Sequence, residues 1–155
     1  MKALVVFYSR TGTTKKFGQF LAKELGAEIE ELIDLTNRKG PIGWLGGGRD
    51  AATKKETQIT QTHFNPKDFD VVLLGSPVWA GTIAPALRTY LNKNKGNFKR
   101  VAFFGTYGGS AGSLFTEFEG LSKKPIGCVG FKTADVVKNA FEEKTKEFCK
   151  NISKI

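Results

Sequence analysis

The sequence predicts an α/β fold: a doubly wound, five-stranded parallel sheet with helices on both faces. Strand-like and helix-like segments alternate from residue 3 to residue 152, and this alternation is typical of such sheets. Several strand-like segments are continuously apolar, as expected for strands that are buried on both faces. The length of 155 residues and the apolar content of 40% fit one globular domain over residues 1–155.

The first strand is predicted over residues 3–8, an unbroken apolar run rich in β-branched and aromatic side chains. A helix is expected next, because apolar side chains then recur at helical spacing. These side chains are Phe17, Phe20, Leu21 and Leu25. Gly26 is the expected helix stop.

The second strand is predicted over residues 27–35, at an exposed edge of the sheet. The alternation places Ala27, Ile29, Ile33 and Leu35 on one face and Glu28, Glu30 and Asp34 on the other. Glu31 and Leu32 are out of phase with this pattern. A rough alternation of this kind is more typical of an edge strand than of a fully buried one.

Residues 36–65 are the least regular part of the chain. They contain Gly40-Pro41, the glycine triplet at 46–48 and a long polar stretch. Only residues 50–56 predict a short helix. A connection of this length is usually functional or mobile.

Three further strands are predicted over residues 70–75, 100–105 and 126–131, with Ser76-Pro77 ending the first of them. Each is followed by an apolar stripe at helical spacing. The stripes are Leu87, Tyr90 and Leu91; Leu114, Phe115, Phe118 and Leu121; and Val137, Phe141, Phe148 and Ile152. Right-handed crossovers then leave only a few doubly wound strand orders.

In such a sheet, ligands bind beyond the carboxyl ends of the strands, where the strand order reverses. The first turn there, residues 9–14, places four hydroxyl side chains around Gly12, just before a helix. Helix N-termini and hydroxyl groups favour phosphate, although the hydroxyls would also serve to cap the helix. The turn matches neither the P-loop nor the dinucleotide fingerprint, which argues against nucleoside triphosphate hydrolysis.

The turns at residues 76–81 and 106–112 each carry one aromatic side chain, Trp79 and Tyr107, among small residues. Flat walls with accessible backbone groups suit a planar ligand with polar edges. Together with the first turn, they predict a planar cofactor that carries a phosphate group.

At these residues the sequence resembles the flavodoxin family. Residues 9–14 fit its Ser/Thr-x-Thr-Gly-x-Thr phosphate loop, and residues 75–81 and 106–109 resemble the loops on either side of its flavin ring. The resemblance covers nearly the whole chain, and the uninterrupted last strand is similar to the short-chain form. It implies the flavodoxin-like strand order 2-1-3-4-5 and non-covalently bound FMN.

The resemblance also implies the residues that bind the cofactor. Those expected to hold the FMN phosphate are Ser9, Arg10, Thr11, Gly12, Thr13 and Thr14. Those expected along the flavin ring are Pro77, Val78, Trp79, Ala80 and Gly81 on one side, and Thr106, Tyr107, Gly108, Gly109 and Gly112 on the other. No catalytic side chain and no metal site is expected, because FMN carries the chemistry.

The function implied is electron transfer between redox proteins, with FMN passing through semiquinone and hydroquinone states. A backbone carbonyl of the Ala80-Gly81 turn is expected near the flavin N5 atom. The alternative is an FMN-dependent NAD(P)H:quinone or flavin reductase, with residues 46–49 as a mobile lid or a plain loop. Oxidation of NADPH by the isolated protein would favour that alternative.

The net charge of +9 departs from typical flavodoxins, which are strongly acidic. It favours acidic redox partners, such as a ferredoxin-like donor. The basic residues are spread along the chain without aromatic interleaving, so no specific nucleic-acid binding is expected. No apolar run is long enough to span a bilayer and no signal peptide is visible, so a cytoplasmic location is expected without membrane insertion.

Overall fold

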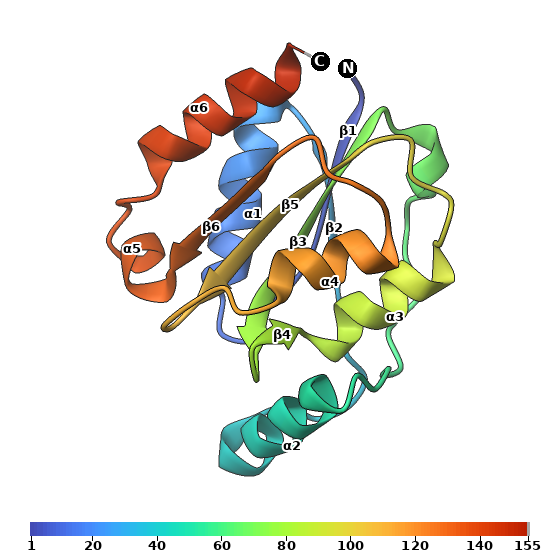
Figure 1. The fold of residues 1–155 in the computed structure, drawn as a ribbon, viewed down its shortest axis with the longest axis vertical. Coiled ribbons are helices and arrows are strands. Elements are labelled where there is room, and N and C mark those ends of the chain that lie inside the picture. Colours follow the sequence, from blue (N-terminus) through green and yellow to red (C-terminus); the bar gives the residue numbers. More distant parts are fainter. Residues whose placement is uncertain (155) are drawn as a thin grey trace.

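The structure, a computed structural model that describes residues 1–154, confirms the predicted doubly wound α/β fold (Figure 1). The parallel strands follow the order β2-β1-β3-β5-β6, and a short strand, β4, pairs antiparallel with β3. Without β4, which the sequence did not predict, this is the order 2-1-3-4-5. The strands are β1 (Ala3–Tyr8), β2 (Glu28–Leu32), β3 (Val71–Trp79), β4 (Thr82–Ile83), β5 (Val101–Tyr107) and β6 (Cys128–Lys132). The helices are α1 (Thr13–Leu25), α2 (Gly40–Ala52), η1 (Pro66–Asp68), α3 (Pro85–Lys93), α4 (Leu114–Leu121), α5 (Thr133–Val137) and α6 (Glu142–Ser153).

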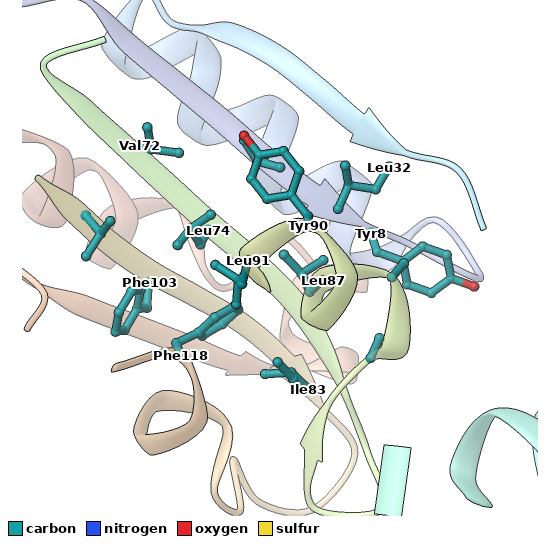
Figure 2. Close-up of a cluster of buried hydrophobic side chains, with 14 of the residues drawn as sticks. Tyr8, Leu32, Val72, Leu74, Ile83, Leu87, Tyr90, Leu91, Phe103 and Phe118 are labelled. Atoms are coloured by element: carbon teal, nitrogen blue, oxygen red, sulfur yellow. The ribbon is translucent and has the colours of Figure 1, made fainter. Parts of the chain in front are cut away.

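Two apolar cores lie on opposite faces of the sheet. Helices α1, α5 and α6 cover one face, and α3 and α4 cover the other (Figure 1). Side chains alternate between the cores, so Val5 of β1 belongs to the first and Leu4 to the second. Figure 2 shows the second core, where Leu74 and Phe103 of the sheet lie near Leu91 of α3. Within residues 1–154, no helix has the length and apolar character needed to cross a membrane.

Strand β2 buries the acidic face of the predicted alternation at Glu30, together with the out-of-phase Leu32. Glu30 and Leu32 are both 3% exposed, whereas Ile29 and Ile33 are exposed. The buried carboxylate of Glu30 accepts hydrogen bonds from the backbone N–H groups of His63 (2.6 Å) and Phe64 (3.0 Å). A buried acidic side chain with such partners is tolerated, and the alternation of β2 therefore did not indicate which face is covered.

Strand β3 is longer than predicted. The sequence placed its end at Ser76-Pro77, but the strand continues to Trp79 and then turns back into β4. The neighbouring strand β1 is paired with β3 only as far as Gly75. Pro77 therefore has a strand on one side only, pairing with Thr106 of β5, and its missing N–H breaks no second ladder.

Residues 40–52 form helix α2, so the prediction of an irregular segment with a helix only over residues 50–56 was wrong. Buried Gly43, Gly47 and Ala51 recur at i, i+4 spacing on one face. Glycine has a low helix propensity, and here it lets the helix backbone approach its neighbours closely. In Figure 1, α2 lies beyond the carboxyl ends of the strands, near β4.

The C-terminal helix is also divided, although the sequence placed its four apolar side chains on one helix. Helix α5 ends at Val137, which is 62% exposed, and α6 begins at Glu142. Between them, Asn139 has φ 61°. An α-helix does not continue through a left-handed residue.

Candidate functional site

The turn after β1 leaves the N-terminus of α1 open to an anion. Gly12 is the N-cap residue, with φ 92°, and α1 has no side-chain cap and no acidic residue in its first turn. The Oγ of Ser9 accepts the N–H of Gly12 at 3.1 Å, which shapes the turn. The first N–H groups of an α-helix have no partner within the helix, and they suit a phosphate here.

A buried pair of hydroxyl groups joins the first turn to the end of β5. The Oγ1 atoms of Thr14 and Thr106 are 2.7 Å apart, and the two residues are 1% and 3% exposed. Each hydroxyl has one hydrogen to donate, and one hydrogen bond uses only one of them. The pair therefore retains one O–H for a further acceptor.

The turn between β3 and β4 is a two-residue hairpin. Ala80 and Gly81 have φ 48° and 79°, as a type I′ turn requires. The carbonyl of Gly81 accepts hydrogen bonds from the N–H (2.7 Å) and the Oγ (3.0 Å) of Ser113. This hairpin is thereby fixed against the start of α4.

These turns surround a cavity of about 160 Å³ at the carboxyl edge of the sheet. The predicted site residues that line it are Arg10, Thr11, Thr13, Thr14, Pro77, Val78, Trp79, Thr106, Tyr107 and Gly108. The predicted residues that do not line it are Ser9, Gly12, Ala80, Gly81, Gly109 and Gly112. The three turns that the sequence singled out thus meet at one place, and part of each turn lies outside the lining.

Sequence reasoning missed two residues that line this cavity, Trp44 and Thr133. Thr133 directly follows β6. Ligands bind beyond the carboxyl ends of parallel strands, and applying this rule to the last strand would have predicted Thr133. Trp44 belongs to α2, which was not predicted. The i, i+4 spacing of Gly43 and Gly47 around it was the available signal.

The guanidinium of Arg10 is held by hydrogen bonds to backbone carbonyls at the beginning of α2. Its Nε donates to the carbonyl of Arg38 at 2.8 Å, and its Nη2 donates to the carbonyl of Gly40 at 3.2 Å. Arg10 therefore ties the turn after β1 to the beginning of α2, while part of its side chain lines the cavity.

A buried ion-pair network holds α2 beside the site. The guanidinium of Arg38 contacts Asp34 at 3.1 Å and Asp50 of α2 at 2.6 Å, and its side chain is 6% exposed. Burial alone would lower the pKa of Arg38, but its hydrogen bonds to Asp50 and Asp34 outweigh burial and raise it. The guanidinium of Arg38 therefore keeps its positive charge within this network.

Trp79 is packed from two sides. Its ring meets Tyr8 edge-on, with centroids 5.5 Å apart, and a Cβ on Gly47 would lie 2.6 Å from its Cζ3 atom. Burial raises the pKa of Tyr8 to about 12, and the nearby Asp34 adds to this effect. Tyr8 is thus a neutral phenol, and Trp79 has little freedom to move toward either neighbour.

The electrostatic character of the cavity is positive. Its lining contains Arg10 and no aspartate, glutamate, histidine or cysteine. The hydroxyls of Thr11, Thr13 and Thr14 supply further side-chain donors from the turn after β1. This lining suits an anionic, planar ligand.

Several solved structures share this fold. A flavoprotein from Lactobacillus acidophilus in complex with FMN is 24% identical, with a TM-score of 0.70, and the match covers 88% of this chain and 97% of that one. The two-electron reduced flavodoxin of Megasphaera elsdenii is 20% identical, with a TM-score of 0.59 and 99% of each chain covered. The oxidised flavodoxin 2 of Bacillus cereus is 18% identical, with a TM-score of 0.60 and 99% of each chain covered.

A search of curated proteins found no significant match. By contrast, a family model described as Flavodoxin matches residues 2–152, which is nearly the entire chain. The strand order agrees with this match, and the chain belongs to the flavodoxin family.

Proposed function

We propose that this protein is an FMN-dependent electron carrier. Membership of the flavodoxin family, with an FMN complex among the structural neighbours, supports FMN as the cofactor. The observation that carries the proposal is the lining of the 160 Å³ cavity, which has donors for a phosphate and aromatic walls but no carboxylate, histidine or cysteine. Such a site binds and orients a redox group and leaves the chemistry to it.

The roles of the residues follow from their positions. The N–H groups at the start of α1 and the hydroxyls of Thr11 and Thr13 would hold the phosphate. Trp79 and Tyr107 would flank the ring and exclude water from it. The remaining O–H of the Thr14 and Thr106 pair would donate to a polar atom of the cofactor. Bound FMN supplies one- and two-electron transfer.

The lack of carboxylates in the cavity sets the electrostatics of this carrier. Negative charge that develops in the cavity meets Arg10 and the positive end of α1, and no acidic lining residue opposes it. Nearby positive charge stabilises anions. The site therefore favours an anionic form of its ligand more than a site lined with carboxylates does.

An acidic redox protein is the partner that suits a net charge of +9. Association steered by opposite charges slows as salt screens them. The rate of electron transfer from an acidic ferredoxin should therefore fall steeply as ionic strength rises. A rate that does not depend on salt would remove this partner from the proposal.

The proposal is tested by an anaerobic reductive titration of the FMN-loaded protein, followed in the visible spectrum, with dithionite and NADPH as separate reductants. Reduction by dithionite in one-electron stages, without reduction by NADPH, supports the carrier. Rapid two-electron reduction by NADPH supports the reductase instead. A protein that binds no FMN would overturn both functions.

Phosphate recognition has its own test. Thr13→Val removes a hydroxyl from the phosphate turn and should weaken FMN binding about tenfold, since a hydrogen bond to a charged group is lost. Binding of riboflavin, which lacks the phosphate, should not change. Thr60→Val, an exposed threonine outside the cavity, is the matched control.

The reductase alternative loses part of its basis. Residues 46–49, which were expected to form a mobile lid or a plain loop, belong to helix α2. The electron carrier is therefore the function that the site supports best.

A further inference from the structure

The two edges of the sheet differ in what lies beside them. The parallel strands end with β2 on one side and with β6 on the other (Figure 1). Residues 58–64 lie along β2: the N–H of Thr60 donates to the carbonyl of Ile33 at 3.1 Å, and two further N–H groups of this segment donate to Glu30. Among residues 1–154, β6 pairs with β5 alone. The chain therefore lays a segment of its own beside one edge and leaves the other edge open.

The hydrogen bonds between β5 and β6 determine which backbone groups of β6 point outward. The N–H of Phe103 donates to the carbonyl of Gly127 at 3.0 Å, and Phe103 is paired in register with Cys128. In a parallel ladder, the backbone groups of successive residues turn alternately toward and away from the neighbouring strand. The N–H and C=O groups of Cys128, Gly130 and Lys132 therefore point away from β5, out of the edge of the sheet.

A cavity of about 530 Å³ follows this edge. Every residue of β6, Cys128–Lys132, lines it, together with Tyr107, Asp135 of α5 and Lys144 of α6. Successive side chains of a strand point to opposite faces of the sheet. A cavity that contacts every residue of the strand therefore lies beside the strand and not over one face. An extended chain of about five residues has the length to follow it.

The charged side chains of the cavity favour an acidic occupant. Lys132 and Lys144 line it and take part in none of the ion pairs within residues 1–154, whereas Asp135 is the only acidic residue of the lining. Opposite charges on neighbouring strands are stabilising, and like charges are destabilising. A second copy of the chain is disfavoured as the occupant, because two molecules with a net charge of +9 repel each other.

We propose that the open edge of β6 binds an extended, acidic segment of a partner protein, which adds to the sheet as a further strand. Its backbone would bond the outward groups of Cys128, Gly130 and Lys132, and its carboxylates would meet Lys132 and Lys144. In strand addition, the main chain supplies affinity and the side chains supply selectivity. The site goes beyond the proposed function, because it takes a peptide and not a cofactor. Of the residues expected to bind FMN, only Tyr107 lines it.

Solvent exchange of the backbone amides, measured by NMR with the peptide acetyl-(Glu-Val)4-amide, tests the proposal. At a peptide concentration that fills about nine-tenths of the sites, the amides of Cys128, Gly130 and Lys132 should exchange about tenfold more slowly. The amides of Val129 and Phe131 face β5 and should not change. The peptide acetyl-(Lys-Val)4-amide has the same length and alternation, and it should bind about tenfold more weakly or less.

Lys132 allows a backbone variant without strain. Its φ is −63°, which is the value that proline requires, and its N–H points away from β5. Lys132→Gln removes only the charge and should weaken binding of acetyl-(Glu-Val)4-amide about threefold. Lys132→Pro also removes the N–H and should weaken it about thirtyfold. Lys93→Gln, at an exposed lysine of α3, is the matched control for charge and should leave binding unchanged.

The apoprotein and the FMN-loaded protein should bind the peptide equally well. The proposal is overturned if acetyl-(Glu-Val)4-amide does not bind, or if the protection from exchange does not alternate along β6. This alternation decides the matter even if Lys132→Pro fails to fold. Equal binding by folded Lys132→Pro and Lys132→Gln would also overturn the proposal. So would displacement of the peptide by FMN, or protection of the same amides without peptide as the protein concentration rises, which would identify a second copy as the occupant.

Discussion

Two glycine-rich segments of this chain look alike in the sequence and have opposite structures. Residues 46–48 lie within helix α2, whereas residues 108–112 form the connection between β5 and α4. Each segment contains one glycine with no room for a side chain. Gly47 lies against the ring of Trp79, and Gly112, with φ 54°, lies against the carbonyl of Gly81. The other glycines of both segments are open.

The comparison shows that a glycine run does not by itself indicate a loop. In α2, the small residues provide a close approach to a neighbour, and contacts with Trp79 and the backbone of Arg38 stabilise the helix. After β5, the glycine at position 112 provides a backbone angle that other residues adopt only at a cost. Substitutions that distinguish the tight glycine from the open ones test this account.

The largest effect is expected at Glu117 of α4, the helix that follows the second glycine segment. Its carboxylate connects α4 to α3 and to the residues just after α2. Its carboxylate contacts Lys54, just after α2, at 2.8 Å, and the buried Arg88 at 3.0 Å. Glu117→Ala leaves the Arg88 charge buried without a counter-ion, which should lower the free energy of unfolding by about 3 kcal/mol. Denaturant unfolding measures this loss. The control is Glu143→Ala, which removes an exposed pair with Lys146 and should not move the unfolding midpoint.

The contribution of Glu117 should also depend on pH. Burial alone would raise its pKa, but hydrogen bonds from Lys54 and Arg88 hold it below the ordinary value of 4.5. A lowered carboxyl pKa stabilises the fold fully above the unfolded value, and this stabilisation is lost as pH falls through the folded value. The stability difference between wild type and Glu117→Gln should therefore be constant from about pH 6 to 8 and shrink below about pH 4.5. A difference that grows in acid would contradict this sign.

Gly112→Ala should be the next most damaging change. The added Cβ would overlap the Gly81 carbonyl, and the left-handed backbone angle adds strain. We expect the free energy of unfolding to fall by about 2 kcal/mol. Gly109→Ala, in the same connection but in open space, should change it by less than about 0.5 kcal/mol. Equal losses for the two variants would mean that contact with the hairpin does not distinguish them.

Gly47→Ala should act on the site more than on stability. Its Cβ would lie 2.6 Å from Cζ3 of Trp79, so the indole must shift, while alanine increases helix propensity. FMN affinity should fall about tenfold, measured by quenching of flavin fluorescence. Gly46→Ala gains the same propensity without the contact and should retain full affinity. If both variants bind FMN as the wild type does, the position of Trp79 does not matter for binding.

The smallest effect sharpens the comparison at the hairpin. Ala80 has φ 48° although it has a side chain, and a left-handed residue with a Cβ costs about 1–2 kcal/mol. Ala80→Gly relieves this strain but adds freedom to the unfolded chain. The net gain in stability should be about 0.5 kcal/mol, seen as a higher melting temperature. A lower melting temperature would show that the turn is not strained at this residue.

Most of the sheet and most of the cavity lining were predictable from local patterns. The continuous apolar runs identified β1, β3 and β5. The expectation that ligands bind beyond the carboxyl ends of parallel strands identified three turns that meet at one cavity. Helix α2 was not predictable in this way, because its stability comes from contacts with residues distant in the sequence. Trp44 was missed with it, and Asn139 gave no warning that the C-terminal helix divides.

The hydrogen bonds of Arg10 have a consequence for how the site responds to occupancy. They join the turn after β1 to the carbonyls of Arg38 and Gly40, where α2 begins. By thermodynamic linkage, a ligand that orders this turn stabilises α2, and a substitution that loosens α2 weakens that ligand by the same factor. Protection of the α2 amides from hydrogen exchange should therefore rise when a ligand binds the turn after β1, although α2 follows this turn by more than twenty residues.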